Sequence, residues 1–435
     1  MAQVTSEREF WDALAAGEQT VTVARSLMLS RPAVLPERTV LEGAAQEDGT
    51  NPVLMFQDSD GVGVTASNAV RGLSISAPAS RRAVFNAGAA EDLGHFEFAD
   101  LGLTGQFSFI MRGGSVHADI EIHDVHVRAA DTRGYLEQPQ KYGVNVLQGA
   151  LTVYNFNARE DARISLRVTG VSTGAPGDPV RGSGVFISGF GDEGGTVEIE
   201  ELTTNEVHAT GAIPFGVANI ITAGVFIVYG AHAKRIVHKG TTATYGVNDM
   251  VLDAWGSVDL WRAEGRVVSY GPSGVGFVNF GTVRTFEALG SVETYGLGAR
   301  GYNQYDGTLE SGTFSSIETF GDGSVGIQVS KQVGSICVQR GITTHGGIGN
   351  TLVKGKNVEL AAIALSVKDG GSIGALEVGG DLVTHGAQVD ALSVEAGGSI
   401  GGGSIAGEVV VHGDGARGVN IAPGAQCELT GIAAE

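Results

Sequence analysis

Two consecutive stretches of this chain decide the fold. Residues 250–274 read MVLDAWGSVDLWRAEGRVVSYGPSG, and residues 275–299 read VGFVNFGTVRTFEALGSVETYGLGA. Both stretches hold three short apolar segments separated by glycines, and both carry a tyrosine before the last glycine corner. Each segment is too short and too closely bounded by glycine to be a helix. A period of about 25 residues therefore predicts a stacked architecture with three short strands in each coil.

The same pattern continues beyond these two coils. One strand type recurs as GVNVLQG (143–149), GVFISGFG (184–191), GVFIVYG (224–230), GYNQYDG (301–307), VGIQVSK (325–331), ALSVKDGG (364–371), ALSVEAGG (391–398) and GVNIAPG (418–424). A second strand type carries one ring per coil, at Tyr245, Tyr270, Tyr295, Phe320 and His345, and then at His385 and His412. Rings at such a strict period are expected to stack on one another. We interpret this series as a structural stack and not as a metal or catalytic site.

Other repeat architectures fit the pattern poorly. Leucine-rich and helical repeats need helices between the strands, and a propeller needs about 40 residues per blade. Before the coils, Ser6 and Glu9 fit a capping box, which predicts a short helix. We expect residues 1–45 to form an N-terminal cap of this helix and entry strands. Residues 46–435 are then expected to form one parallel β-helix, with irregular coils to about residue 140 and regular coils after it. RAADTRGYLEQPQKYG (128–143) is expected to project as a polar loop.

Over residues 20–430 the chain resembles the right-handed parallel β-helix superfold of the pectate-lyase type. The resemblance rests on FWDALAAG (10–17), TVTVARSLMLS (20–30), LPERTVLEG (35–43) and the repeated coils. It implies an all-β chain that forms a single right-handed β-helix with three strands per coil. The calcium-binding aspartates and catalytic arginine signature of the lyases are missing, as are the paired aspartates of polygalacturonase-like hydrolases. Any function taken from the resemblance is therefore an analogy of fold.

Composition narrows the possible partners. The formal net charge of −20 repels phosphate backbones, so we expect no nucleic-acid binding. Cysteine and histidine spacing matches no zinc motif, and His123 and His126 are expected on opposite faces of a strand. We predict no metal and no cofactor. The start of the chain lacks the features of a signal peptide and no apolar run is long enough for a membrane span. We expect a cytoplasmic protein that does not bind membranes, or a secreted one if a leader has been removed.

Alternation along the strands places the candidate site. Leu252, Phe277, Tyr302 and Ile327 recur at the period of the coils and are mostly apolar, so we expect this ladder inside the coil. The alternate positions then form a strip on the outer face that mixes aromatic and polar side chains. The strip is expected to bind a ligand through Trp255, Phe280, Asn303, Tyr305, Gln328, Arg300 and Lys354. Aromatic faces fringed by amides and carboxylates suit sugar rings, so the sequence predicts a carbohydrate ligand.

Three acids are candidates for catalysis on this strip: Asp253, Asp249 and Asp306. Glycoside hydrolysis usually needs two carboxyl groups around the scissile bond. Asp253 and Asp306 are expected roughly 10 Å apart from the strand spacing, slightly wider than the inverting geometry. A lyase needs a base and positive charge, and the net charge of −20 fits a polyuronate substrate poorly. We therefore expect a glycoside hydrolase or transglycosidase in preference to a lyase.

Several alternatives stay open at the level of sequence. The aromatic strip is also explained by stacking between coils, or by a covering loop or subunit. A non-catalytic β-solenoid, such as an adhesin-like or scaffold protein, explains the regular C-terminal coils equally well. A trimeric phage-type spike is a third interpretation. The last coil offers an open edge, so we also expect a homo-oligomer, a dimer or a trimer, or a folded-back tail that covers it.

Overall fold

The structure is a computed structural model that describes residues 1–46, 49–353 and 356–430. The chain is all-β, mostly with parallel strands, and has one α-helix among the described residues. It divides into two compact units. Unit 1 holds Met1–Pro139, Leu147–Val207 and Ile227–Lys234, and unit 2 holds Gln140–Val146, His208–Phe226 and Arg235–Glu435. The expected division at residue 45 stays a prediction.

The expected N-terminal helix is present in unit 1 as α1 (Glu7–Ala15). Its N-cap is Ser6, whose hydroxyl accepts a hydrogen bond from the Glu9 backbone N–H at 3.3 Å. The Glu9 carboxylate returns to the backbone N–H of Thr5, one residue earlier than in the standard capping box. Phe10 is buried and anchors the helix.

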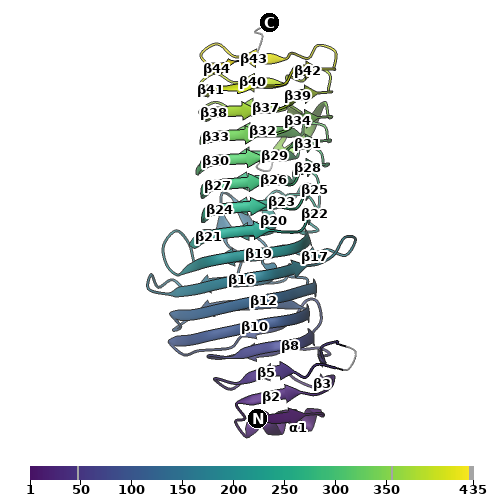
Figure 1. Cartoon of the computed structure of the whole chain (residues 1–435), viewed down its shortest axis with the longest axis vertical. Coiled ribbons are helices and arrows are strands. Elements are labelled where there is room, and N and C mark those ends of the chain that lie inside the picture. Colours follow the sequence, from purple (N-terminus) through teal and green to yellow (C-terminus); the bar gives the residue numbers. More distant parts are fainter. Residues whose placement is uncertain (47–48, 354–355, 431–435) are drawn as a thin grey trace. The chain divides into compact units, whose positions relative to one another are not determined.

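The strands of unit 1 form parallel ladders (Figure 1). One ladder runs through β1 (Ala2–Val4), β2 (Thr20–Val23), β5 (Val40–Gly43), β8 (Ala69–Ser76), β10 (Asp92–Thr104), β12 (His117–Ala129), β16 (Arg163–Thr173) and the first part of β19 (Thr196–Thr210). Another runs through β4 (Ala33–Val34), β7 (Val62–Val64), β9 (Arg82–Asn86), β11 (Gln106–Arg112), β15 (Gly149–Phe156) and β18 (Ser183–Ser188). Shorter pieces are β3 (Leu27–Leu29), β6 (Val53–Phe56) and β17 (Val180–Arg181).

A left-handed residue inside β12 overturns the expectation that His123 and His126 face opposite sides. Asp124 has a φ of 50°, and its ladder neighbours Asp100 and Gly170 are also left-handed. The extra residue advances the alternation by one, so Ile122 and Val125 both face the core and both histidines face away from it. No cluster of three metal-ligating side chains occurs in the described part of the chain.

Unit 2 contains three in-register parallel ladders. The first is β24 (Ser257–Ala263), β27 (Thr282–Ala288), β30 (Thr308–Phe314), β33 (Gln332–Val338), β38 (Ser372–Val378), β41 (Ser399–Ile405) and β44 (Gln426–Thr430). The second is β22 (Thr242–Thr244), β25 (Val267–Ser269), β28 (Val292–Thr294), β31 (Ile317–Thr319), β34 (Gly341–Thr344), β39 (Asp381–Thr384) and β42 (Val409–Val411). The third is β23 (Asp249–Ala254), β26 (Val275–Asn279), β29 (Arg300–Gln304), β32 (Val325–Val329), β37 (Leu365–Val367), β40 (Leu392–Val394) and β43 (Val419–Ile421). This arrangement is compatible with a parallel β-helix.

The remaining strands lie outside these ladders or at the edges of the units. β20 (Ile220–Ile227) and β21 (Ala231–His238) each contain a point at which the chain passes from one unit to the other. β13 (Gln140–Lys141) and β14 (Val144–Val146) form a short antiparallel hairpin. A second antiparallel pair, β35 (Ile348–Val353) and β36 (Lys356–Ala361), is inserted between two coils. This insertion explains why the interval from His345 to His385 is longer than the intervals between the earlier rings of the stack.

The core of unit 2 confirms the predicted interior ladder. Leu252 pairs with Phe277, Phe277 with Tyr302, and Tyr302 with Ile327, and all four side chains are buried. Phe277 stacks on Phe286 at 3.8 Å between ring centroids, so the two sides of the coil meet in the middle. The predicted ring stack is also confirmed: neighbouring rings from Tyr245 to His412 lie 4.6–5.2 Å apart.

A buried polar pair completes this core. The Trp261 indole N–H donates a hydrogen bond to His238 Nε2 at 2.7 Å. Burial lowers the pKa of His238 to about 3, which keeps the imidazole neutral and able to accept this bond.

Candidate functional site

A pocket of about 400 Å³ lies on the side of β23, β26, β29 and β32 that faces away from the core. Its floor consists of side chains from these strands and their ends, including Asp253, Trp255, Phe280, Arg300 and Asn303. Its other walls come from Tyr142–Val144, in the turn and start of the β13–β14 hairpin, and from residues 218–221, which lead into β20. Asn145 and Val146 of β14 pair with β20, which joins these two walls. All of these residues belong to unit 2.

The corners between the second and third ladders form the lower rim. Asn248, Ser273, Gly298 and Gly323 occupy equivalent corners, and each has a φ between 56° and 69°. Asn248 and Ser273 line the pocket, although an L-residue with a side chain rarely adopts this conformation. At Gly298 a side chain is impossible, since a Cβ there would lie 1.7 Å from Thr351 Oγ1 of β35. Ser273 Oγ lies 3.2 Å from the same Thr351 hydroxyl, so β35 supports this rim.

Asp253 is the most unusual group in the pocket wall. Its side chain is 0% exposed, and neither carboxylate oxygen accepts a hydrogen bond from any residue that the structure describes. Burial raises the pKa of Asp253 well above its usual value. The neighbouring Trp255 indole opposes this shift, but its N–H forms no hydrogen bond of standard geometry with the carboxylate. Burial therefore favours the neutral, protonated form of the Asp253 carboxyl group, and Asp253 is one of the residues that line the pocket.

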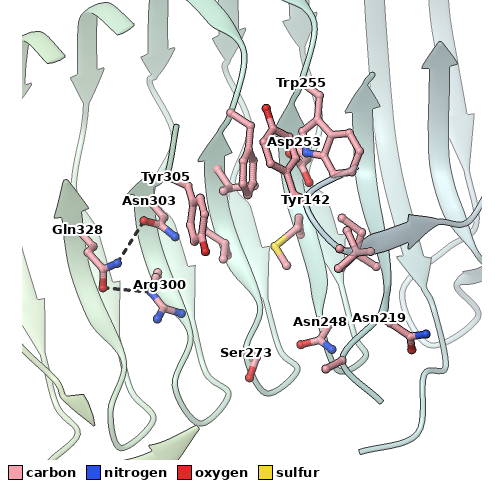
Figure 2. Close-up of a pocket in the computed structure, with 18 residues that line it drawn as sticks. Tyr142, Asn219, Asn248, Asp253, Trp255, Ser273, Arg300, Asn303, Tyr305 and Gln328 are labelled. Atoms are coloured by element: carbon pink, nitrogen blue, oxygen red, sulfur yellow. Dashed lines mark hydrogen bonds between the residues drawn. The ribbon is translucent and has the colours of Figure 1, made fainter. Parts of the chain in front are cut away.

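Aromatic rings surround Asp253 at one end of the pocket (Figure 2). Trp255 and Phe280 lie 6.0 Å apart between centroids, and Phe280 and Tyr305 lie 4.7 Å apart. Tyr142 closes this group from above, at 5.2 Å from Trp255 and 4.6 Å from Phe280. The alternative of a covering loop describes this end of the strip: Trp255 is only 5% exposed, and Tyr142 of the hairpin packs against it.

Polar side chains gather at the other end of the pocket, where Figure 2 shows Arg300, Asn303 and Gln328 together. Arg300 is 7% exposed, and its Nε donates to Gln328 Oε1 at 3.4 Å. Gln328 in turn donates to Asn303 Oδ1 at 3.5 Å. Burial lowers the pKa of Arg300 to about 10, so the guanidinium still carries its charge at neutral pH.

Two of the predicted site residues that the structure describes, Asp249 and Asp306, do not line the pocket. Asp249 is buried behind it and accepts hydrogen bonds from the backbone N–H groups of Gly211 and Gly246 and from the Thr222 hydroxyl. Burial raises the pKa of Asp249 to about 6, and these hydrogen bonds limit the shift. Asp306 lies at the half-buried bend after β29. Lys354 lies outside the described residues.

Asp249 instead organises one wall of the pocket. Gly211 and Thr222 stand at the two ends of the segment that supplies residues 218–221, and the Asp249 carboxylate holds both ends. The neighbouring Asn248 amide donates to the carbonyl of Val217 in the same segment at 2.8 Å. Asp249 is therefore a positioning residue for this wall.

Sequence reasoning missed Tyr142, Asn219, Asn248 and Ser273, which also line the pocket. Tyr142 lies at the end of the segment expected to project as a polar loop, and its aromatic character was the available signal. Asn248 and Ser273 are equivalent, at the period of the coils, to Gly298 and Gly323, and these glycines were the available signal for a left-handed corner.

Comparisons with known protein families, with curated proteins and with solved structures gave no match. Within the described residues, no helix has the length and apolar character that crossing a membrane requires.

Proposed function

We propose that the chain is a right-handed parallel β-helix of the pectate-lyase type, with three strands per coil. The in-register ladders of unit 2 support this, because each residue of one coil pairs with its equivalent in the next. Such a β-helix provides a rigid frame for the pocket, since strands hold side chains more firmly than loops do.

We propose further that the protein is a carbohydrate-active enzyme that cleaves or transfers glycosidic bonds at the pocket. One observation carries the proposal: the buried Asp253, whose pKa burial raises well above its usual value, lines a space walled by Trp255, Phe280, Tyr305 and Tyr142. Aromatic faces pack against the C–H faces of sugar rings. A carboxylic acid that stays protonated at neutral pH is the group that a glycosidase uses to protonate the leaving oxygen.

Hydrolysis or transglycosylation fits this acid better than elimination does. In this scheme the Asp253 proton passes to the glycosidic oxygen as its bond to the anomeric carbon breaks, the leaving sugar departs as an alcohol, and the oxygen of water or of an acceptor hydroxyl forms the new bond at that carbon while its proton restores the acid. A lyase would need an unprotonated base instead, and burial works against that state at Asp253. The second group of a glycosidase is usually a carboxylate, but some families use a tyrosine or a group of the substrate itself. Tyr142 and Tyr305 both line the pocket and are the candidates for that role.

A second candidate function is a non-catalytic β-solenoid that binds a saccharide. Asp253 is the only carboxyl group among the described residues that line the pocket, which favours this alternative over a two-carboxylate hydrolase. The homo-oligomer expected from the open last coil stays a prediction, which light scattering on the full chain tests.

A panel of defined oligosaccharides distinguishes the two functions. We expect cleavage or transfer products from at least one glycan, and loss of these products in Asp253→Asn. Asp306→Asn is the matched control, because it removes a carboxylate of the same strand series that does not line the pocket. Binding without any product would support the non-catalytic alternative. Activity that survives Asp253→Asn would contradict the role given to this acid.

A further inference from the structure

Arg300 carries hydrogen-bond donors that the described residues of the chain do not use. A guanidinium has five N–H groups in a planar fork. In the described chain Arg300 makes two hydrogen bonds, from Nε to Gln328 Oε1 at 3.4 Å and from Nη1 to the Gly298 carbonyl at 3.1 Å. Both acceptors are neutral, and no carboxylate of the described residues forms an ion pair with it. Three N–H groups of a nearly buried cation are therefore left for a ligand.

A nearly buried guanidinium lowers the stability of the folded protein unless an anion binds to it. Buried arginines are normally paired with a carboxylate, because removing a charge from water costs several kcal/mol. Even arginines of unit 2 that are partly exposed have a carboxylate partner: Arg262 binds Glu287 and Arg266 binds Glu293. Arg300 departs from this pattern, at a position that lines the pocket.

The surrounding amides hold the guanidinium in place for a ligand. Gln328 accepts from Arg300 and donates to Asn303 Oδ1, which leaves the Asn303 amide N–H groups as further donors at this end (Figure 2). Asp253, the one acid among the described lining residues, stands at the opposite end among the aromatic rings. The polar end therefore offers donors and a positive charge.

We infer that Arg300 is the specificity residue of the pocket and that the bound saccharide carries an anionic group, a carboxylate, sulfate or phosphate ester, at this end. The inference rests on the proposed carbohydrate function. Planar and tetrahedral oxyanions both match the guanidinium fork. The net charge of −20 disfavours a long polyanion, but it allows a short saccharide with one charge held at Arg300. A volume of about 400 Å³ also suits a short ligand.

The test is calorimetric titration of the full chain with sugars that differ only in charge. Suitable pairs are glucose with glucuronate, glucose 6-sulfate or glucose 6-phosphate, and galactose with galacturonate. The charged member is expected to bind roughly 10- to 100-fold more tightly, as for hydrogen bonds to charged groups. Arg300→Gln is expected to abolish this preference, and Arg300→Lys to recover part of it. Arg340→Gln, an exposed residue outside the pocket, lowers the net charge equally and is expected to keep the preference.

The outcomes separate this inference from the function on which it rests. Equal or tighter binding of the neutral sugars overturns the anion site and leaves the carbohydrate function standing. Arg300-dependent binding of inorganic sulfate, phosphate or benzoate without any sugar binding supports the anion site and contradicts the carbohydrate function. Absence of binding to every probe overturns both. Thermal melting of Arg300→Gln shows whether the variant folds, and we expect a melting temperature at least as high as that of the parent.

Discussion

Replacing Asp253 by asparagine is expected to change how the stability of the protein depends on pH. The difference in the free energy of unfolding between Asp253→Asn and the parent should shift in favour of the variant as the pH rises from acid to neutral. Both carboxylate oxygens are buried without a hydrogen bond, so the folded chain keeps Asp253 protonated while the unfolded chain ionises it near pH 3.8. An acid whose folded pKa is raised contributes fully below the unfolded pKa, and its contribution is lost as pH rises toward the folded pKa. Each pH unit in that window costs ~1.4 kcal/mol.

The expected magnitude follows from this slope. Between pH 4 and pH 6 the free energy of unfolding of the parent should fall relative to Asp253→Asn, by at most about 2.4 kcal/mol. The ionisation of Asp249, with a pKa of about 6, affects both proteins equally and cancels in the difference. Asparagine keeps the size of the side chain, so the difference reports the proton and little else.

Urea unfolding at pH 4, 5, 6 and 7, followed by tryptophan fluorescence, measures this difference. Asp306→Asn is the control, because its half-buried side chain should give no comparable slope. A difference between parent and Asp253→Asn that stays constant over this pH range would refute the reasoning. It would mean that the folded protein compensates an ionised Asp253, and the case for a protonated acid in the pocket would fail.

Three further changes test other parts of unit 2. Asp249→Ala leaves two backbone N–H groups and the Thr222 hydroxyl without their acceptor, and should cost about 3 kcal/mol or more in urea unfolding and weaken ligand binding. Trp261→Phe removes the indole N–H that donates to His238 Nε2 and should cost about 1–3 kcal/mol by calorimetric melting, whereas no loss would show that the bond is dispensable. Burial and its stacked neighbours lower the pKa of His385, so its contribution is present above pH 6.5 and is lost on acidification. His385→Phe should therefore reduce the fall in melting temperature below pH 6.5, and an unchanged fall would contradict this.

The period of the sequence was sufficient to predict the ladders and both faces of β23. A strict repeat fixes which residues are neighbours between coils, so the Leu252 ladder and the ring stack could be indexed directly. Alternation then placed Asp253 on the side away from the core, together with Trp255. These are consequences of strand geometry, and no longer-range contact is needed to derive them.

What lies above that face could not be predicted from the period. Tyr142 reaches the pocket from a hairpin far away in the sequence, and it packs against the buried Trp255 ring. Asp249 is on the same strand as Asp253, yet backbone donors from Gly211 and Gly246 capture it behind the wall. In β12 a single left-handed residue, Asp124, puts His123 and His126 on the same face, although opposite faces were expected. Each case depends on a local conformation or an insertion that breaks the repeat.

Asp253 and Arg300 are the acidic and the basic residue of the pocket, and they do not form an ion pair with each other. This separation is the strongest evidence that the pocket binds a ligand. Asp253 and Arg300 belong to strands of the same ladder, with β26 between them, and Val278 of β26 pairs with both Asp253 and Asn303. An arginine at position 278 would have placed a cation directly beside the acid, but the chain has an apolar residue there. A purely structural ladder would favour apolar side chains or a paired salt bridge at such buried positions. Two buried groups that reduce stability, facing one space from opposite ends, are instead typical of a site whose ligand completes their interactions.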